Sequence, residues 1–244
     1  MLVKQKLKYI QTLGQKKFRQ QEGLFIAEGP KLVKELMEAD ATFVKEIYAV
    51  QEWMNENLHL LGKTAITEIT EIELKRISQL TTPNKVVAIV QQYPTRDTIT
   101  VKSRIILVLD CLQDPGNLGT IIRIADWFGI EQIVCSNDSA DLYNPKVVQA
   151  TMGSIARVKV YYRDLEEWLG TQKDVPIYAA NLDGQDVTTM NKIKEGIIIF
   201  GNESKGISAE LLKLATSRIT IPKKGKAESL NVAVAVGIVL SKII

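Results

Sequence analysis

Three short polar segments carry the residue types that could do chemistry in this chain. They are residues 110–117 (DCLQDPGN), 201–206 (GNESKG) and 222–231 (PKKGKAESLN). Each segment follows an apolar run, precedes an expected helix, and combines glycine with carboxylate, amide or hydroxyl side chains. Because glycine lets backbone N–H groups approach a ligand closely, we expect the three segments to line one ligand pocket.

The familiar phosphate-binding motifs are absent from these segments. No G-x-G-x-x-G occurs in the sequence, and although Gly201 and Gly206 have the spacing of a P-loop, Ile207 stands where a P-loop has lysine. These differences argue against dinucleotide and nucleoside-triphosphate binding of the usual kinds.

Histidine and cysteine usage narrows the possible sites further. His59 is the single histidine, which excludes a histidine-rich metal site and disfavours Ser-His-Asp catalysis. We expect His59 to be structural or exposed, and we expect no metal. Cys111 and Cys135 lie in or beside apolar runs, which suggests free thiols in a reducing cytoplasm rather than a disulfide framework.

The termini show no sign of export or membrane insertion. The start, MLVKQKLKYI, lacks the apolar core of a signal peptide. The longest apolar stretch, residues 232–240, is too short to span a bilayer. We therefore expect a cytoplasmic protein without a membrane partner.

The residues after 105 alternate between strand and helix patterns. Apolar runs predict strands over 105–109, 132–135, 177–180, 196–200 and 218–221, and helical spacing predicts helices over 117–128 and 208–214. Residues 229–244 contain a strand-like VAVAV, but their length favours a helix. The alternation predicts an α/β fold with a mostly parallel sheet covered on both sides. Ligands bind such sheets beyond the carboxyl ends of the strands, where the three polar segments lie.

The N-terminal part reads as a smaller α/β unit. Helices are expected over 31–39 and 68–80, and strands over 43–50 and 85–91. The polar stretch 93–104 (YPTRDTITVKSR) suggests a boundary. We therefore expect domains over 1–95 and 105–244, joined by a linker over 96–104.

Basic residues gather in two places, although the net charge is only +3. Residues 1–22 contain six lysines and arginines against a single acid, and we expect Lys16, Lys17 and Arg19 to contact the phosphate backbone of a nucleic acid. A solvated first helix is the alternative. The second cluster flanks the third polar segment and consists of Arg218, Lys223, Lys224 and Lys226. We predict that it contacts phosphates of a nucleic acid near the site, with an ordinary solvated loop as the alternative.

The three polar segments, in this order, resemble the three motifs of the SpoU (TrmH-like) family of RNA ribose methyltransferases, within the SPOUT superfamily. The matching stretches are 114–129 (DPGNLGTIIRIADWFG), 199–208 (IFGNESKGIS) and 221–240 (IPKKGKAESLNVAVAVGIVL). Residues 150–160 (ATMGSIARVKV) also look family-like, and 18–36 (FRQQEGLFIAEGPKLVKEL) resemble the family's substrate-binding domain. The resemblance covers almost the whole chain.

The resemblance implies a fold and partners that no periodicity could predict. It implies a SPOUT-type sheet whose C-terminal end forms a deep trefoil knot, a topology so rare that pattern alone would not propose it. It implies that S-adenosyl-L-methionine binds in the knot, and that two copies form a homodimer with the site at their interface. The N-terminal domain is expected to be a ribosomal-protein-like RNA-binding fold.

Motif by motif, the resemblance also assigns site residues. It places Gly201, Ile221 and Leu230 in the donor pocket, largely through backbone groups. It makes the catalytic set Asn117, Arg123, Glu203, Ser229 and Asn231. Because a guanidinium stays charged in proteins, we expect Arg123 to hold the adjacent phosphate while the hydroxyl proton passes to phosphate or water. From the residues alone, Ile221 and Leu230 read as core, Arg123 as a surface residue and Ser229 as a helix N-cap.

The expected function is S-adenosylmethionine-dependent methylation of a ribose 2′-hydroxyl in structured RNA, with ribosomal RNA as the expected substrate. The 2′-hydroxyl as acceptor means RNA rather than DNA. Alternatives are a transfer RNA 2′-O-methyltransferase, a catalytically silent RNA-binding relative, and a methyltransferase acting on a base nitrogen. A small-molecule α/β enzyme would leave the basic N-terminal arm unexplained.

Overall fold

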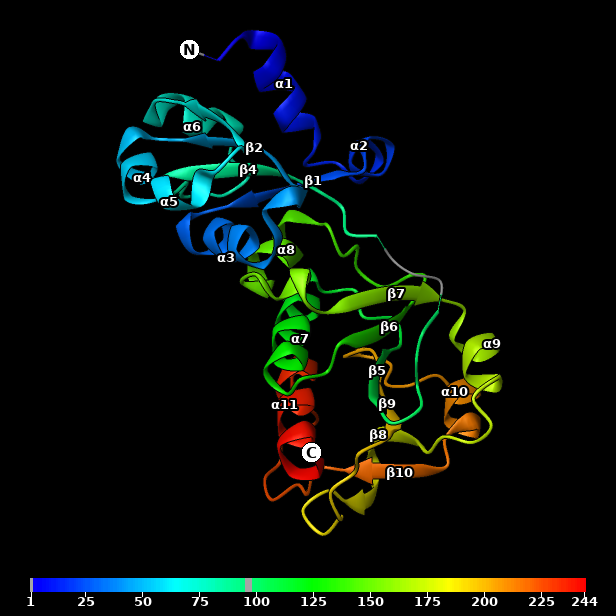
Figure 1. Cartoon of the computed structure of the whole chain (residues 1–244). Helices are drawn as coiled ribbons and strands as arrows, with labels where there is room; N and C mark the ends of the chain where they lie inside the picture. Colours follow the sequence, from blue (N-terminus) through cyan, green and yellow to red (C-terminus); the bar gives the residue numbers. More distant parts are fainter. Residues whose placement is uncertain (1, 95–97) are drawn as a thin grey trace. The chain divides into compact units, whose positions relative to one another are not determined.

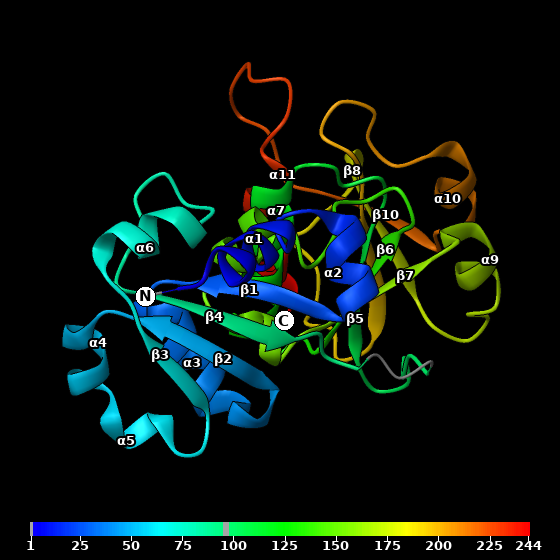
Figure 2. The same ribbon diagram turned by 90° about the horizontal axis from the view of Figure 1, so that it is seen from above.

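The computed structural model describes residues 2–94 and 98–244 of the chain. The chain divides into two compact units (Figures 1 and 2). Unit 1 consists of Met1–Pro94 and Asp141–Arg157, and unit 2 of Thr95–Ala140 and Val158–Ile244. The expected division into 1–95, 96–104 and 105–244 stays a prediction, since residues 96 and 97 of the linker lie outside the described part. The sequence did not suggest that 141–157 would pack with the N-terminal residues.

Unit 1 is built on a four-stranded sheet with the order β1-β4-β2-β3. Its strands are β1 (Leu24–Glu28), β2 (Val44–Ala49), β3 (Ala65–Glu68) and β4 (Val86–Gln91). Strand β4 runs antiparallel to β1 and β2, and β3 runs parallel to β2. The helices are α1 (Lys4–Thr12), α2 (Lys16–Glu22), α3 (Pro30–Asp40), α4 (Gln51–Glu56), α5 (Leu58–Leu61), α6 (Glu71–Ile77) and α8 (Pro145–Thr151), with short 3-10 turns at Ala41–Phe43 and Ser154–Ala156.

Most of the elements predicted for unit 1 are present, with one boundary wrong. Strands β2 and β4 and helix α3 agree with the expected ranges, and α3 begins at Pro30, where a fixed φ suits a helix start. The helix expected over 68–80 is shorter. Glu68 ends strand β3, and helix α6 begins only after Thr70, whose hydroxyl and Glu73 form a capping box. Strands β1 and β3 were not predicted from the sequence.

Unit 2 contains a six-stranded sheet with the order β10-β8-β9-β5-β6-β7, in which all neighbours are parallel. The strands are β5 (Ile105–Leu109), β6 (Gln132–Ser136), β7 (Lys159–Arg163), β8 (Ile177–Asp186), β9 (Gly196–Phe200) and β10 (Ser217–Thr220). Leu109 pairs with Phe200 on one side and Cys135 on the other. The polar segments that follow β5 and β9 therefore start side by side.

Helices cover both faces of this sheet (Figure 1). Helices α7 (Pro115–Trp127) and α11 (Val232–Ile243) pack together on one face, and α9 (Leu165–Gly170) and α10 (Ala209–Leu214) lie on the other. Along β5, Ile106 and Val108 join the core beneath α9 and α10, so the alternating Leu107 and Leu109 face α7 and α11. Strand β9 is buried throughout, as a central parallel strand should be.

The fold class expected from the sequence is confirmed for unit 2, which is a parallel α/β layer structure. Strands β5 and β9 have the predicted bounds, and residues 232–243 form a helix rather than a strand. Strand β8 extends six residues beyond the expected end at 180. Strand β7 and helix α9 were missed. The trefoil knot itself stays a prediction.

Candidate active site

The first polar segment leads directly into helix α7. Asp114 is the N-cap of this helix, and its Oδ1 accepts the backbone N–H of Asn117 at 2.7 Å. An aspartate at this position satisfies an N–H that has no partner within the helix and complements the positive helix start. The cap fixes Asn117 in the first turn of α7, beyond the carboxyl end of β5.

The second polar segment forms a tight loop after β9. The backbone groups of Asn202 and Gly206 bond reciprocally, at 3.0 and 2.9 Å, which closes the loop around Glu203. A Cβ on Gly201 would lie 2.1 Å from the carbonyl carbon of Gly206. Because backbone atoms cannot move away cheaply, only glycine fits at position 201.

The third polar segment ends where helix α11 begins. Asn231 is the N-cap, and its Oδ1 accepts the N–H groups of Ala233 and Val234 at 3.0 and 3.3 Å. Ser229, which read as a possible cap, lies two residues before Asn231 and is exposed. The cap of α11 is therefore Asn231.

One chain of side-chain hydrogen bonds connects the three segments. Asn231 donates through Nδ2 to Oδ1 of Asn117 at 2.9 Å, and Asn117 donates through Nδ2 to Oε1 of Glu203 at 2.7 Å. The capping bonds fix Asn231 Oδ1 as an acceptor, so its Nδ2 must face Asn117. This in turn points the amide nitrogen of Asn117 at the carboxylate. The direction of each bond follows from the start of helix α11.

Arg123 lies six residues after Asn117 on α7, about 9 Å along the helix axis. Its side chain is exposed, together with Thr120 and Trp127 on the same side of the helix. Trp127 is 85% exposed, which is unusual for so large an apolar surface. The structure brings Asn117, Glu203 and Asn231 into contact, whereas Arg123 and Ser229 are exposed and do not join this hydrogen-bonded chain.

A hollow of about 280 Å³ lies beside the third segment. It is lined by Leu182, Thr220, Ile221, Pro222, Lys223 and Glu228. Apolar walls with a few polar groups are typical of nucleoside and cofactor sites. The apolar residues suit an adenosyl group, and the Glu228 carboxylate suits a cation. Of the residues expected to bind the donor, Ile221 lines this hollow, while Gly201 and the half-exposed Leu230 do not.

The residues expected to bind RNA have different surroundings. Lys16, Lys17, Lys223, Lys224 and Lys226 are exposed. Arg218 is exposed too, and its Nη1 lies 2.8 Å from a carboxylate oxygen of Asp183.

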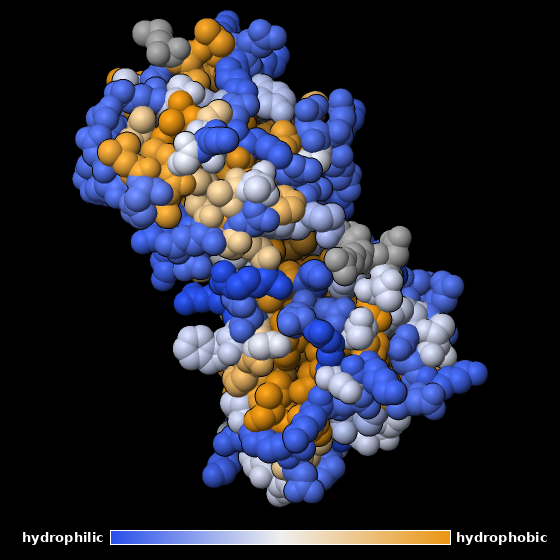
Figure 3. Space-filling model, viewed as in Figure 1, coloured by the Kyte–Doolittle hydropathy of each residue, from blue (hydrophilic) through white to orange (hydrophobic). Residues whose placement is uncertain are grey.

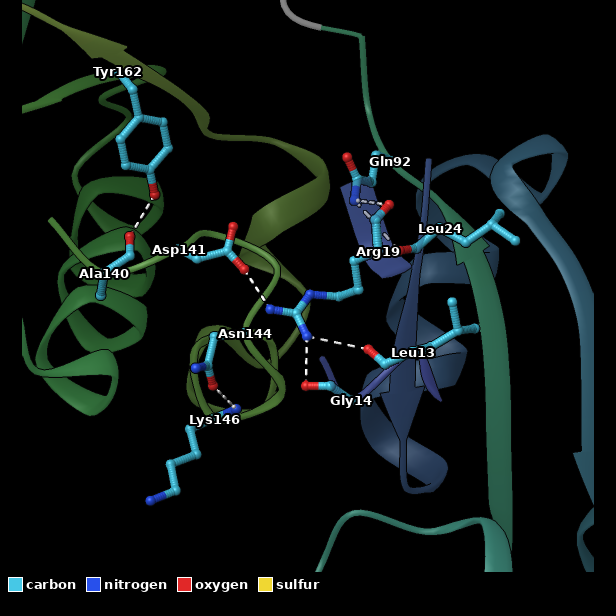
Figure 4. Close-up of polar contacts among 10 residues, drawn as sticks. All are labelled: Leu13, Gly14, Arg19, Leu24, Gln92, Ala140, Asp141, Asn144, Lys146 and Tyr162. Carbon is cyan, nitrogen blue, oxygen red and sulfur yellow. Dashed lines mark hydrogen bonds and ion pairs between the residues drawn. The ribbon is translucent and has the colours of Figure 1, made fainter. Parts of the chain in front are cut away.

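The expectation for Arg19 was wrong, because its side chain is only 3% exposed. The guanidinium donates to the carbonyl oxygens of Leu13 and Gly14 at 3.1 and 2.7 Å and forms an ion pair with Asp141 at 2.5 Å (Figure 4). The basic N-terminal residues suggested that Arg19 would be exposed and available to phosphate. Instead, Asp141, which is distant in sequence, supplies a carboxylate that pairs with the buried guanidinium.

A second hollow, of about 370 Å³, runs between α7 and α11. It is lined by Asn117, Thr120, Ile124, Asn231, Ala233, Val234, Gly237, Ile238 and Ser241. Hydrophobic surface gathers over these two helices in Figure 3. Asn117 and Asn231 thus belong both to the hydrogen-bonded chain and to this groove.

Sequence reasoning missed several residues of the site. Leu182 and Glu228 line the hollow beside the third segment. Leu182 lies outside the three polar segments, and Glu228 lies within the third segment but was not singled out there. Asn202 was overlooked although it stands directly before Glu203, where a second amide in a glycine-bounded segment was a usable signal.

The described residues contain neither a cluster of metal ligands nor a membrane-spanning helix. Within 2–94 and 98–244, no three histidine, cysteine or carboxylate side chains are grouped so as to hold a metal ion. In the same ranges, no helix is both long enough and apolar enough to cross a membrane.

Comparisons with known proteins agree with the motifs. The model of the SpoU rRNA Methylase family matches residues 104–241, and the model of the MRM3-like substrate binding domain matches residues 4–88. A 23S rRNA (guanosine(2553)-2′-O)-methyltransferase of Bacillus subtilis is 32% identical over 97% of this chain and 94% of its own.

Solved structures show the same architecture over the full length. A putative TrmH-family RNA methyltransferase from Porphyromonas gingivalis is 36% identical with a TM-score of 0.86, covering 99% of this chain and 98% of its own. An AdoMet-bound rRNA methyltransferase from Sinorhizobium meliloti is 31% identical with a TM-score of 0.84, covering 99% and 95%. With its three motifs in one hydrogen-bonded cluster and these matches, the chain belongs to the SpoU rRNA methylase family.

Proposed function

We propose that this protein transfers a methyl group from S-adenosyl-L-methionine to a ribose 2′-hydroxyl of ribosomal RNA. The observation that carries the proposal is the hydrogen-bonded chain Asn231–Asn117–Glu203, which joins all three motifs. Family membership supports the reaction class, and the Bacillus subtilis relative, named as a 23S rRNA 2′-O-methyltransferase, supports the RNA class.

The hollow beside Ile221 is the proposed donor site. S-adenosylmethionine supplies an electrophilic methyl group on a sulfonium. Leu182, Ile221 and Pro222 provide apolar contacts for the adenosine, and Glu228 offers a carboxylate to the cationic donor. Gly201 and Leu230 do not line this hollow, and only the family resemblance supports their proposed contact with the donor through backbone groups.

Arg123 is the proposed anchor for the acceptor RNA. Its guanidinium is exposed on α7, and a planar fork of N–H groups can grip a phosphate through two parallel bonds. Holding the phosphate next to the acceptor ribose fixes the direction of the 2′-oxygen, and such alignment contributes several kcal/mol to transfer reactions. The hydroxyl proton passes to that phosphate or to water, because the guanidinium stays protonated.

Glu203 and Ser229 complete the proposed polar lining. Glu203 is held by Asn117 and keeps further lone pairs free to accept hydrogen bonds from the RNA or the donor. Ser229 is exposed in the third segment, where its hydroxyl can turn toward either ligand.

The exposed lysines are proposed to bind RNA backbone. Lys223, Lys224 and Lys226 stand next to the donor hollow, and Lys16 and Lys17 lie at the start of α2 in the matched substrate-binding domain. Arg218 adds a further positive charge, which its ion pair with Asp183 partly neutralises. Their joint role is attraction of phosphate, which is independent of sequence.

We also propose a cytoplasmic homodimer formed through the groove between α7 and α11. Val234 is 51% exposed there, on a helix that is apolar nearly all round. Exposed apolar surface of this kind is typical of protein interfaces. A second copy would then border Asn117 and Asn231. Ile238→Glu should yield monomers in analytical ultracentrifugation, while Ile72→Glu, at an exposed position of unit 1, should not.

The decisive experiment is methylation of cellular RNA from a strain that lacks the gene. Purified protein and labelled S-adenosylmethionine should transfer label to large-subunit ribosomal RNA, and nuclease digestion with mass analysis should give a 2′-O-methylnucleoside. Label in transfer RNA would identify the alternative substrate, and a base-methylated nucleoside would overturn the ribose assignment. If the protein transfers no methyl group, and calorimetry detects no binding of S-adenosylmethionine, it is an RNA-binding protein without methyltransferase activity.

A further inference from the structure

Asn202 makes more hydrogen bonds than any role in loop closure requires. Its Oδ1 accepts the backbone N–H groups of Ser204 and Lys205 at 2.8 and 3.1 Å. Because Oδ1 accepts these two hydrogen bonds, the Nδ2 of Asn202 faces the other way, and it donates to the carbonyl oxygen of Cys111 at 2.8 Å. The side chain therefore ties the second loop to the first.

Cys111 presents that carbonyl from an unusual backbone conformation. Its φ is +54°, in the left-handed region that residues with a Cβ seldom adopt. The Cys111 N–H donates to Oγ of Ser136 at 2.8 Å, at the end of the neighbouring strand β6. Ser136 is held in turn by Asp138 at 2.5 Å. Both the N–H and the carbonyl group of Cys111 are therefore hydrogen-bonded, which holds the carbonyl oxygen in place.

The far end of the loop is tied to the same place. Oδ2 of Asp110 accepts the backbone N–H of Ser208 at 2.8 Å. Asp110 and Cys111 are consecutive, so the loop from 202 to 208 is attached at both ends to one dipeptide at the end of β5. Glu203, the residue after Asn202, therefore lies in a loop that is attached at both ends.

We infer that Asn202 is a positioning residue that holds Glu203 in place for the reaction by anchoring it to the Cys111 carbonyl. The anchor extends the hydrogen-bonded chain, because Glu203 accepts a hydrogen bond from Asn117, and Asn117 accepts one from Asn231. This inference rests on the proposed function. A shift of a positioning group by about 1 Å can change a transfer rate by roughly a hundredfold, so the anchor acts on kcat rather than on folding.

The substitution Asn202→Asp distinguishes the hydrogen bond to Cys111 from the hydrogen bonds within the loop. An aspartate still accepts the N–H groups of Ser204 and Lys205, but an ionised carboxylate cannot donate to the Cys111 carbonyl. Asn202→Ala removes both. Asn55→Asp is the matched control, because Asn55 is exposed on α4 and its side chain bonds only to Gln51 among the described residues.

We expect N202D and N202A to lower kcat by about tenfold to a hundredfold, with a smaller change in KM for the donor. In the background of E203A, measured in single turnovers with excess enzyme, N202D should add less than about a twofold loss, because two residues acting through one group are not additive. A wild-type kcat for N202D, with only N202A impaired, would reduce Asn202 to a loop-turn residue and overturn the inference. Independent, multiplying effects of N202D and E203A would overturn it as well.

A readout without turnover separates this inference from the proposed function. The side-chain amide of Asn117, assigned by its loss in Asn117→Asp, reports its bond to Glu203 in a nitrogen–proton NMR spectrum. We expect N202D to shift this signal and N55D to leave it unchanged. If wild-type protein methylates no RNA but N202D shifts the amide, the function fails and the anchor stands. If the protein is active and the amide does not move, the anchor fails.

Discussion

Asn231 donates a side-chain hydrogen bond to Asn117 across 2.9 Å, although 114 residues separate them in the chain. The same Asn231 caps helix α11, so one amide both starts a helix and orients a motif residue. These two tasks use different atoms of the side chain, Oδ1 for the cap and Nδ2 for Asn117, and substitutions can therefore separate them.

Asn231→Asp should keep the cap and lose the hydrogen bond to Asn117. Aspartate and asparagine cap helices about equally well, so we expect the free energy of unfolding to change by less than about 0.5 kcal/mol, whereas Asn231→Ala should cost about 1 kcal/mol. Both variants should lower methyl transfer at least about tenfold. Urea unfolding and initial rates test this. Asn144→Asp, another N-cap in unit 1, is the control for the cap alone. An active N231D would remove the Asn117 hydrogen bond from the mechanism.

Arg123→Ala should lower kcat by about a hundredfold or more, the range seen when one electrostatic interaction with a reacting group is removed. Arg123→Lys should recover only part of the rate, because a lysine cannot grip phosphate through two parallel bonds. Arg76→Ala, at an exposed position of α6, serves as the control. The assignment of Arg123 is wrong if R123A turns over at nearly the wild-type rate while Asn117→Ala is inactive.

Joint replacement of Lys223 and Lys224 by alanine should flatten the salt dependence of RNA binding. Removing one lysine–phosphate ion pair lowers the slope of log K against log salt by about 0.7 to 0.9, so we expect a decrease of about 1.5 for the two lysines together. Lys173→Ala with Lys213→Ala removes the same charge from exposed positions away from the third segment. Filter binding at several salt concentrations measures both slopes, and equal slopes would assign Lys223 and Lys224 to solvent.

Arg19→Ala should destabilise unit 1 by about 3–5 kcal/mol, because it leaves Asp141 and two carbonyl oxygens without their partner in a buried place. Lys17→Ala, two residues away and exposed, should change the free energy of unfolding by no more than about 0.5 kcal/mol. Urea titrations monitored by fluorescence give both values. A stable R19A protein with a reduced RNA salt slope would restore Arg19 to the RNA surface.

Glu28 should make unit 1 sensitive to pH. Burial raises the pKa of this carboxyl above its ordinary 4.5, against the lowering effect of hydrogen bonds from Ser78 and the Gln79 N–H. A raised folded pKa means that the stabilising contribution is present below the unfolded pKa and is lost as pH rises through the folded value. As the pH rises from the unfolded-state pKa to the folded-state pKa of Glu28, the Glu28→Gln variant should therefore become more stable relative to wild type. Glu71→Gln, exposed on α6, should not. A constant difference between E28Q and wild type would refute the shift.

The sequence by itself determined the local elements and the identity of the motifs. Runs such as IILVL and GIIIF predicted the bounds of β5 and β9, because a run of about five apolar, mostly branched residues has the length and composition of a strand buried on both faces. It also brought the three motifs to the carboxyl ends of the parallel strands. The missed strands β1 and β3 are short, and their periodicity is too weak to stand out.

Only the tertiary structure decided which polar atoms meet. Asn117 and Glu203 are 86 residues apart, and no spacing rule states that the amide of one points at the carboxylate of the other. Arg19 shows the same limit, since its exposure depends on an aspartate 122 residues away. Local propensity acts over a few residues, whereas burial and hydrogen-bond direction depend on segments that come together only when the chain has folded.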